Sequence, residues 1–314
     1  MGSGFSLIII RSMSKKILIT GSEGFVGPYL RELAVLKGDD VFGITQSECD
    51  LTDFKKTDGL LNKIQPDVIF HLAGKSSVTD SLQDPFATFS TNIFSVLNIL
   101  ESARQLKSKP VILSAGSSEE YGILSSTAPL KEEMPLNPTS PYGSSKVIQE
   151  NIALQYFKHF KVKVVLSRTF NHTGPKQGPR AVAPAFARQI AEIELGLKAP
   201  LLKVGNLEAV RDFSDVRDIV KAYYLASEKC DFGIPYNISS DKAVKIADIL
   251  ETLLSFSKIR ITVEKDPNLF RPVDVPIKVG DSSRFRRKTG WENKIPLEKT
   301  LLDILNYFRN ELAK

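Results

Sequence analysis

A tyrosine and a lysine stand four residues apart in the segment PYGSSK, as Tyr142 and Lys146. Four residues is about one helical turn, so both side chains share a face if a helix begins at Pro141 with Ser140 as its cap. A phenol with its ordinary pKa near 10 is a sluggish acid at neutral pH. An ammonium about 5 Å away would favour the phenolate by roughly 3 kcal/mol and lower the pKa of Tyr142 by about two units. The pair therefore predicts a proton donor tuned by a neighbouring charge.

A serine upstream completes a candidate catalytic set. Ser117 lies in SAGSSEEYG (114–122), at the end of an apolar segment, and its hydroxyl could polarise a substrate carbonyl oxygen. In the reducing direction, hydride reaches the carbon while Tyr142 gives a proton to the oxygen, and Lys146 can bond a nicotinamide ribose. The alternative interpretation is a surface Tyr–Lys pair without chemistry, because pairs of this spacing also occur by chance.

Three glycines form a second motif in TGSEGFVG (20–27), namely Gly21, Gly24 and Gly27. Gly21 permits a tight turn, Gly24 lets a pyrophosphate approach the backbone, and Gly27 lets the next helix pack against the strand. The start of that helix offers free amides and a partial positive charge to phosphates. The motif predicts a dinucleotide site.

The elements that must position these residues alternate regularly up to about residue 170. Short apolar segments and longer amphipathic segments in turn indicate a parallel sheet covered by helices on both faces. Right-handed crossovers then predict an α/β fold with a doubly wound, Rossmann-like sheet. We expect strands at 16–21, 40–45, 66–74, 110–116 and 163–170, and helices at 24–38, 53–64, 84–106 and 140–160.

The alternation loosens in the second half, where Pro and Gly cluster at 174–184. We expect a cofactor-binding Rossmann domain over 13–172 and a smaller, mixed α/β substrate domain over 173–314. The chain should return to the first domain around 202–230. Expected in this half are short strands in PLLKV, PYNIS and IRITV, and helices near 183–196, 215–229, 245–256 and 296–312.

The end of the second strand normally decides between NAD and NADP, because an acid there binds the ribose 2′-hydroxyl and repels a 2′-phosphate. Thr45 and Gln46 occupy that place, and Glu48 lies further on as a loop charge. The missing acid favours NADP(H) without excluding NAD(H). No arginine stands there to bind a 2′-phosphate.

Composition narrows the class of protein. The 314 residues are 42% hydrophobic and 25% charged with a net charge of +6, which suits an anionic small ligand and gives no argument for nucleic acid. We expect no membrane span, and the two cysteines fit a reduced cytoplasmic setting. The three histidines lack ligand-like spacing, so no metal is expected. Met13 could be the natural start, with residues 1–12 left from a vector.

Four motifs together resemble the extended short-chain dehydrogenase/reductase family that acts on nucleotide sugars: TGSEGFVG, HLAG (71–74), SAGSSEEYG and YGSSK. The resemblance covers about 15–310. Asp50 could otherwise be a simple helix cap. Besides the three glycines, the resemblance implies cofactor contacts from Phe25, Val26, Asp50, Leu51, Leu72, Ala73 and Lys75.

The second half resembles enzymes of GDP-6-deoxyhexose synthesis, most closely those that reduce GDP-4-dehydro-6-deoxy-D-mannose to GDP-D-rhamnose. The segments concerned are RTFNHTGPKQGP, FARQIAEIELG, VGNLEAVRDFSDVRD and FRPVDV. Guanidinium groups give paired, charge-assisted bonds to phosphate oxygens, although any one arginine could instead form a surface ion pair. The resemblance implies that Asn171, Val182 and Arg188 line the sugar-nucleotide pocket, that Arg211 and Arg271 meet the diphosphate, and that Asp274 meets the ribose.

Glu119 keeps a second reaction open. It stands two residues after Ser117, where the related GDP-mannose 4,6-dehydratases carry their catalytic glutamate, and it could be the base that eliminates water. Against that reading, TGPKQGPRA replaces the Arg-rich segment typical of those dehydratases. Another nucleotide-sugar epimerase or reductase, or a non-catalytic cofactor-sensing protein, are further alternatives. The resemblance also implies a homodimer formed through the helices at 84–106 and 140–160.

Overall fold

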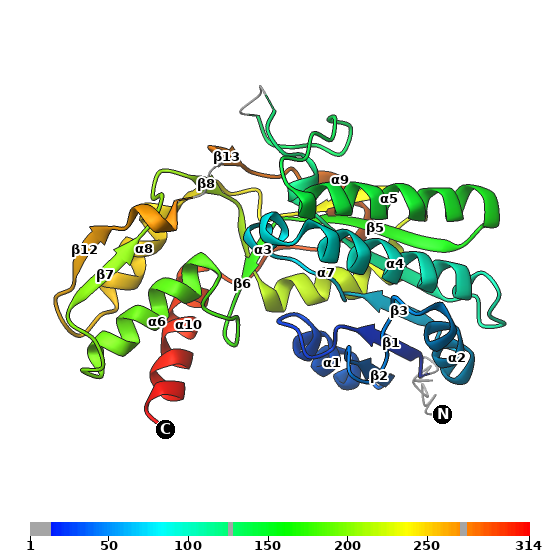
Figure 1. The fold of residues 1–314 in the computed structure, drawn as a ribbon, viewed down its shortest axis with the longest axis horizontal. Helices are drawn as coiled ribbons and strands as arrows, with labels where there is room; N and C mark the ends of the chain where they lie inside the picture. Colours follow the sequence, from blue (N-terminus) through cyan, green and yellow to red (C-terminus); the bar gives the residue numbers. More distant parts are fainter. Residues whose placement is uncertain (1–13, 125–127, 271–274) are drawn as a thin grey trace, which may run out of the picture.

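The computed structural model describes residues 14–124, 128–270 and 275–314, and its centre is a six-stranded parallel sheet (Figure 1). The strand order is β10-β5-β4-β3-β1-β2, so β1 lies between β2 and β3, the two strands that follow it in the chain. The predicted α/β class with a doubly wound sheet is confirmed. Its strands are β1 (Lys16–Thr20), β2 (Asp40–Ile44), β3 (Val68–His71), β4 (Val111–Ser117), β5 (Lys163–Thr169) and β10 (Pro235–Ile238).

Successive side chains of β1 enter two different cores, which is why the sheet strands are apolar throughout. Ile17 and Ile19 pack on one face and Leu18 on the other. The first face is covered by α1 (Gly27–Leu36), α7 (Val216–Lys229) and α9 (Ser283–Thr289). The second is covered by α2 (Phe54–Ile64), α4 (Pro85–Ala103) and α5 (Pro141–Phe160), with α3 (Val78–Gln83) beside α4 and α5.

A further apolar core lies apart from the sheet and its two faces, on the side where Figure 1 shows the C-terminus. It forms between α6 (Val182–Glu194), α8 (Ile246–Ser255) and α10 (Leu297–Leu312). Three small sheets accompany it, with the orders β11-β8-β13, β12-β7 and β6-β9. Their strands are β6 (Asn171–Thr173), β7 (Leu201–Val204), β8 (Val210–Arg211), β9 (Phe213–Asp215), β11 (Val244–Lys245), β12 (Thr262–Lys265) and β13 (Ile277–Lys278).

Some elements were not expected from the sequence. The strands β6, β8, β9, β11 and β13 have two or three residues each, too few to show a hydrophobic period. The short helices α3 and α9 were missed for the same reason. The segment PYNIS was assigned to the substrate half, whereas β10 pairs with β5 as the outer strand of the main sheet.

The strand order reverses at β1, because the chain runs from β1 to β2 on one side and then crosses to β3 on the other. Ligands of open α/β sheets bind outside the carboxyl ends of the strands at such a reversal. Within the part of the chain that the structure describes, no helix is both long and apolar enough to span a bilayer.

Candidate active site

The glycine turn between β1 and α1 fits the pyrophosphate of a dinucleotide. Gly21 has a φ of +67°, and Gly24 donates its amide to the Gly21 carbonyl at 3.0 Å. A Cβ at Gly27 would lie 2.4 Å from the Ser22 carbonyl oxygen, so only glycine allows α1 to begin so close to the turn. No side chain caps α1 at Val26, which leaves its first amides open to an anion.

The loop after β3 lies directly against this turn. A Cβ on Gly21 would be 3.0 Å from the Ala73 backbone, and Ala73 donates its amide to Thr20 Oγ1 at 3.1 Å. Leu72 packs at the edge of the core of the first face. The structure thus brings Leu72 and Ala73, two of the expected cofactor residues, to the glycine turn.

Asn92 of α4 fixes the same loop, and sequence reasoning missed it. Its Oδ1 accepts the Lys75 amide at 2.8 Å, and its Nδ2 donates to the Lys75 carbonyl at 3.0 Å and to Ser145 Oγ at 2.8 Å. Ser145 in turn donates to the Tyr142 carbonyl at 2.7 Å. The feature that could have identified Asn92 is its place on the buried side of an apolar helix, where a polar group must have hydrogen-bond partners.

Phe25 connects the glycine turn to the second half of the chain. Its ring stacks on His172 of β6, with centroids 6.0 Å apart and planes at 7°. Nearby, Tyr29 donates its hydroxyl to the Pro175 carbonyl at 2.7 Å. The loop after β6 is therefore positioned against the start of α1.

Glu48 is closer to the end of β2 than its place in the sequence suggested. Its Oε2 accepts the Thr45 amide at 2.8 Å and the Thr45 hydroxyl at 3.0 Å. Glu48 is an exposed residue of the turn after β2, as expected for a loop charge, and its carboxylate lies beside Thr45, the first residue after that strand. An acid at the end of this strand is what normally binds the ribose 2′-hydroxyl.

Asp50 is not the helix cap that the sequence left open, because Asp53 caps α2 by accepting the Lys56 amide. Asp50 Oδ1 accepts from the Thr52 hydroxyl at 2.7 Å and the Thr52 amide at 2.9 Å, and these bonds lower the pKa of the Asp50 carboxyl. The neighbouring Leu51 is buried.

Ser117, Tyr142 and Lys146 come together at the carboxyl end of β4. Ser117 and Tyr142 are neighbours: the Ser117 side chain acts to lower the pKa of the Tyr142 phenol, and each residue is 8% exposed. Lys146 Nζ lies 6.0 Å from the Tyr142 ring centroid and donates to the Ala115 carbonyl at 2.8 Å. The helix begins as expected, with Ser140 Oγ accepting the Gly143 amide at 3.1 Å.

The expected lowering of the pKa of Tyr142 by Lys146 is wrong. Burial raises the pKa of the Tyr142 phenol well above its usual range, and the Glu119 and Glu120 charges raise it further. The Ser117 side chain acts in the opposite direction and does not offset them. Burial also lowers the pKa of Lys146 to about 8. Sequence reasoning counted the attraction between ammonium and phenolate and omitted desolvation.

Gly143 explains how α5 approaches the end of β4 so closely. A Cβ at this position would lie 2.7 Å from the Glu119 carbonyl oxygen, which belongs to the 3₁₀ turn η1 (Ser118–Glu120). The glycine of PYGSSK therefore lets the helix start pack on the turn that follows Ser117.

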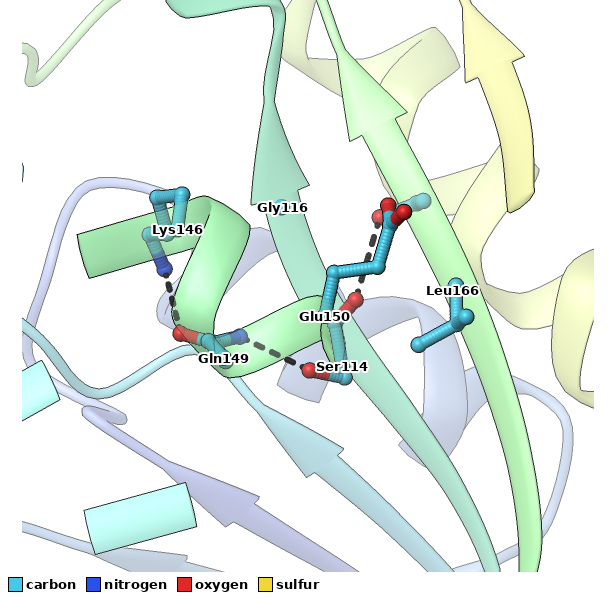
Figure 2. A pocket seen from close by; sticks show the side chains of 7 residues that line it. Ser114, Gly116, Lys146, Gln149, Glu150 and Leu166 are labelled. Carbon is cyan, nitrogen blue, oxygen red and sulfur yellow. Dashed lines mark hydrogen bonds between the residues drawn. The ribbon is translucent and has the colours of Figure 1, made fainter. Parts of the chain in front are cut away.

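A buried polar network extends from Lys146 to β4, and Figure 2 shows its links through Gln149 to Ser114. Lys146 donates to Gln149 Oε1 at 3.1 Å, and Gln149 donates to Ser114 Oγ at 2.7 Å. Glu120 Oε1 accepts the Ser117 amide at 2.7 Å. Burial raises the pKa of Glu120 to about 8, and the Glu150 charge adds to this effect.

Glu119 has a cationic partner that sequence reasoning also missed. Its Oε1 lies 2.7 Å from Nζ of Lys278, a residue of β13 that is 2% exposed. The signal was a lysine within the otherwise apolar segment VPIKV. Because Lys278 pairs in register with Arg211 of β8, the ion pair joins the small sheet of the second half to the end of β4.

The other expected substrate residues are less tightly connected to the end of β4. Asn171 begins β6 directly after β5, and Val182 begins α6. Arg188 forms an ion pair with Glu192 of its own helix at 2.9 Å. Arg211 donates to the Val210 carbonyl at 2.9 Å. The remaining two, Arg271 and Asp274, lie outside the described residues, as do residues 1–12.

Comparison with known proteins agrees with this site. Residues 45–304 match the family model described as GDP-mannose 4,6 dehydratase. The chain is 31% identical to a GDP-6-deoxy-D-mannose reductase of Pseudomonas aeruginosa, over 96% of this chain and 100% of that protein. It is 28% identical to a GDP-mannose 4,6-dehydratase of Vibrio cholerae, with 93% of each chain covered.

A solved structure, RMD from Pseudomonas aeruginosa complexed with NADPH, superimposes with a TM-score of 0.88 at 29% identity, over 95% of this chain and 100% of that one. The family match and the similarity along the full length together settle the relationship that the motifs predicted. The chain belongs to the GDP-mannose 4,6-dehydratase family, within the extended short-chain dehydrogenases/reductases.

Proposed function

We propose that this enzyme reduces the 4-keto group of GDP-4-dehydro-6-deoxy-D-mannose to give GDP-D-rhamnose. The observation that carries the proposal is the placement of Ser117 and Tyr142 next to each other and beside Lys146, at the carboxyl end of β4. The reductase relative, similar over its whole length, supports reduction as the reaction.

NADPH is the proposed cofactor, with NADH as a second one, and it supplies the hydride when bound. Gly21, Gly24 and Gly27 with the uncapped start of α1 would hold the pyrophosphate. The fit rests on the close approach at Gly27, where a side chain would fill the cradle. Glu48 beside Thr45 supports some use of NADH, since a carboxylate there favours a free 2′-hydroxyl. Further contacts are proposed from Phe25, Val26, Asp50, Leu51, Leu72, Ala73 and Lys75.

Tyr142 is the proposed proton donor. Its raised pKa keeps the phenol protonated, which is the form that reduction requires, and the Ser117 hydroxyl stabilises negative charge on the reacting oxygen. The Lys146 ammonium adds positive charge beside the phenol ring. As phenolate forms during proton transfer, that charge becomes favourable.

The substrate is proposed to lie between the end of β4 and the small sheets of the second half. Asn171, Val182, Arg188, Arg211, Arg271 and Asp274 are the proposed contacts to the GDP-sugar. This assignment corresponds to a cofactor domain over 13–172, rejoined around 202–230 and again by β10 and α9, and a substrate domain formed by the rest of 173–314. The separate core of α6, α8 and α10 supports such a division.

A GDP-mannose 4,6-dehydratase is the second candidate, favoured by the position of Glu119 after Ser117 and by the dehydratase relatives. A dehydratase would convert GDP-mannose into a keto sugar without net use of NADPH. A cofactor-sensing protein would turn over neither substrate. Incubation with GDP-4-dehydro-6-deoxy-D-mannose or GDP-mannose, with NADPH oxidation and products recorded, separates the three.

A homodimer is proposed through the outer surfaces of α4 and α5. These two helices pack together and leave large apolar side chains in solvent, which favours burial against a second copy. The exposed side chains are Phe86, Phe94, Ile148 and Phe160.

We also propose a cytoplasmic location, supported by the unpaired, buried Cys49 and Cys230 and testable by cell fractionation.

A further inference from the structure

The ion pair between Lys278 and Glu119 takes no part in the proposed transfer of hydride and proton. Lys278 is 2% exposed, and its ammonium lies 2.7 Å from Glu119 Oε1, two residues after Ser117. A buried ammonium is costly unless it has an anionic partner. The pair also joins two parts of the fold, since Lys278 belongs to β13 and Glu119 to η1.

Charged or titratable groups from three parts of the fold lie near Glu119. From its own turn it has the buried Glu120, and from α5 it faces Tyr142, whose phenol pKa both glutamates raise. From the small sheet it meets Lys278, with Arg211 as the register partner of that lysine on β8. The Glu119 backbone is fixed as well, because its amide donates to Ser117 Oγ at 3.2 Å.

We propose that Lys278 is a positioning residue for the reduction, which holds the Glu119 carboxylate in place and compensates its charge beside Ser117 and Tyr142. The inference rests on the proposed function. Negative charge develops on the substrate oxygen during hydride transfer, and an uncompensated carboxylate nearby opposes it. A carboxylate bound to an ammonium is also a poor base, so the pair favours reduction over elimination of water.

The test compares kcat at neutral pH for the full-length wild type and four variants. In Lys278→Met, kcat should fall by roughly tenfold or more, because the Glu119 carboxylate then lies beside Ser117 and Tyr142 without its counter-charge. The fall should vanish in Lys278→Met/Glu119→Gln and be largely rescued in Lys278→Arg. Lys245→Met is the control: it removes a lysine of neighbouring β11 that forms an ion pair with Glu208, and it should keep the wild-type kcat.

Two results would overturn the inference. One is a folded Lys278→Met variant with the wild-type kcat, and the other is a loss of kcat that persists in the double variant. Melting temperatures at neutral pH give a readout without turnover. Lys278→Met should melt below the wild type, and the double variant should recover most of that difference; a double variant that melts as low as Lys278→Met contradicts charge compensation. If the wild type itself does not oxidise NADPH with the keto sugar, the proposed function fails, and the melting arm alone decides whether Lys278 compensates Glu119.

Discussion

At the scale of single residues, burial has a larger effect on the pKa of Tyr142 than the positive charge of Lys146 has. The phenol is desolvated and lies near two glutamates, so its pKa is raised, and the nearby Lys146 does not reverse this. This favours reduction, because the proposed donor stays protonated at neutral pH. Lys146 and Glu120 instead titrate nearer neutrality, since burial lowers the pKa of Lys146 to about 8 and raises that of Glu120 to about 8.

Removal of the Tyr142 hydroxyl tests the proposed donor. Tyr142→Phe should lower kcat by about a hundredfold or more, because general acid catalysis contributes on that order. The dissociation constant of NADPH should stay within about twofold of wild type, measured by fluorescence titration. A variant with nearly full kcat would show that the proton comes from elsewhere.

The alkaline side of the pH profile tests Lys146. Its pKa is lowered from the ordinary lysine value to about 8, so the ammonium is present below that pH and is lost above it, and kcat should fall there. Glu120 titrates in the same range, so a second variant is needed to assign the fall. Lys146→Arg stays charged and should show no alkaline fall, even with a lower plateau. An unchanged fall in that variant would assign the titration to Glu120.

At the scale of elements, the sequence predicted the regular parts and missed the local contacts. The strands β1 to β5 and helices α1, α2, α4 and α5 were predicted because their periodicity extends over many residues. Lys278 could not be connected to Glu119 from the sequence, since 159 positions separate them (278 minus 119) and the contact depends on how β13 pairs with β8. The energetic balance at Tyr142 was missed because burial is a tertiary property.

Gly143 tests the contact between α5 and η1. A methyl group would lie 2.7 Å from the Glu119 carbonyl oxygen, so Gly143→Ala should displace the helix start, cost about 1–3 kcal/mol of unfolding free energy and lower kcat. Gly59→Ala is the matched control, because Gly59 is also helical but has nothing within 4 Å, and it should be neutral or stabilising by up to about 1 kcal/mol. Urea unfolding and kcat for both variants check this. Equal effects in the two would remove the steric argument.

At the scale of the whole molecule, two parts of the fold contribute to the site. The parallel sheet, with an apolar core on each face, positions the glycine turn and the group of Ser117, Tyr142 and Lys146, and the separate core of α6, α8 and α10 supports the small sheets. The stacking of Phe25 on His172 and the Glu119–Lys278 pair connect the two parts. A ligand bound between them would stabilise both, by an amount set by its concentration and affinity.

The proposed dimer is tested on the outer face of α4. Phe94 is 50% exposed, and Phe94→Glu should convert a dimer into monomers by placing charge in an apolar interface. Leu36→Glu changes an even more exposed apolar side chain, at the end of α1, and should leave the mass unchanged. Light scattering after size-exclusion chromatography gives the mass. A wild-type monomer, or a dimer unaffected by Phe94→Glu, would contradict this interface.

The stoichiometry of NADPH oxidation is the sharpest test of whether this enzyme reduces the 4-keto sugar. Wild-type enzyme is incubated with NADPH and GDP-4-dehydro-6-deoxy-D-mannose, and in parallel with GDP-mannose, while NADPH absorbance and the sugar products are followed. We expect about one NADPH to be oxidised per keto sugar reduced. We also expect that GDP-mannose is not consumed and that Tyr142→Phe nearly abolishes turnover. Formation of a keto sugar from GDP-mannose without net NADPH oxidation would contradict this expectation and would identify the enzyme as a dehydratase.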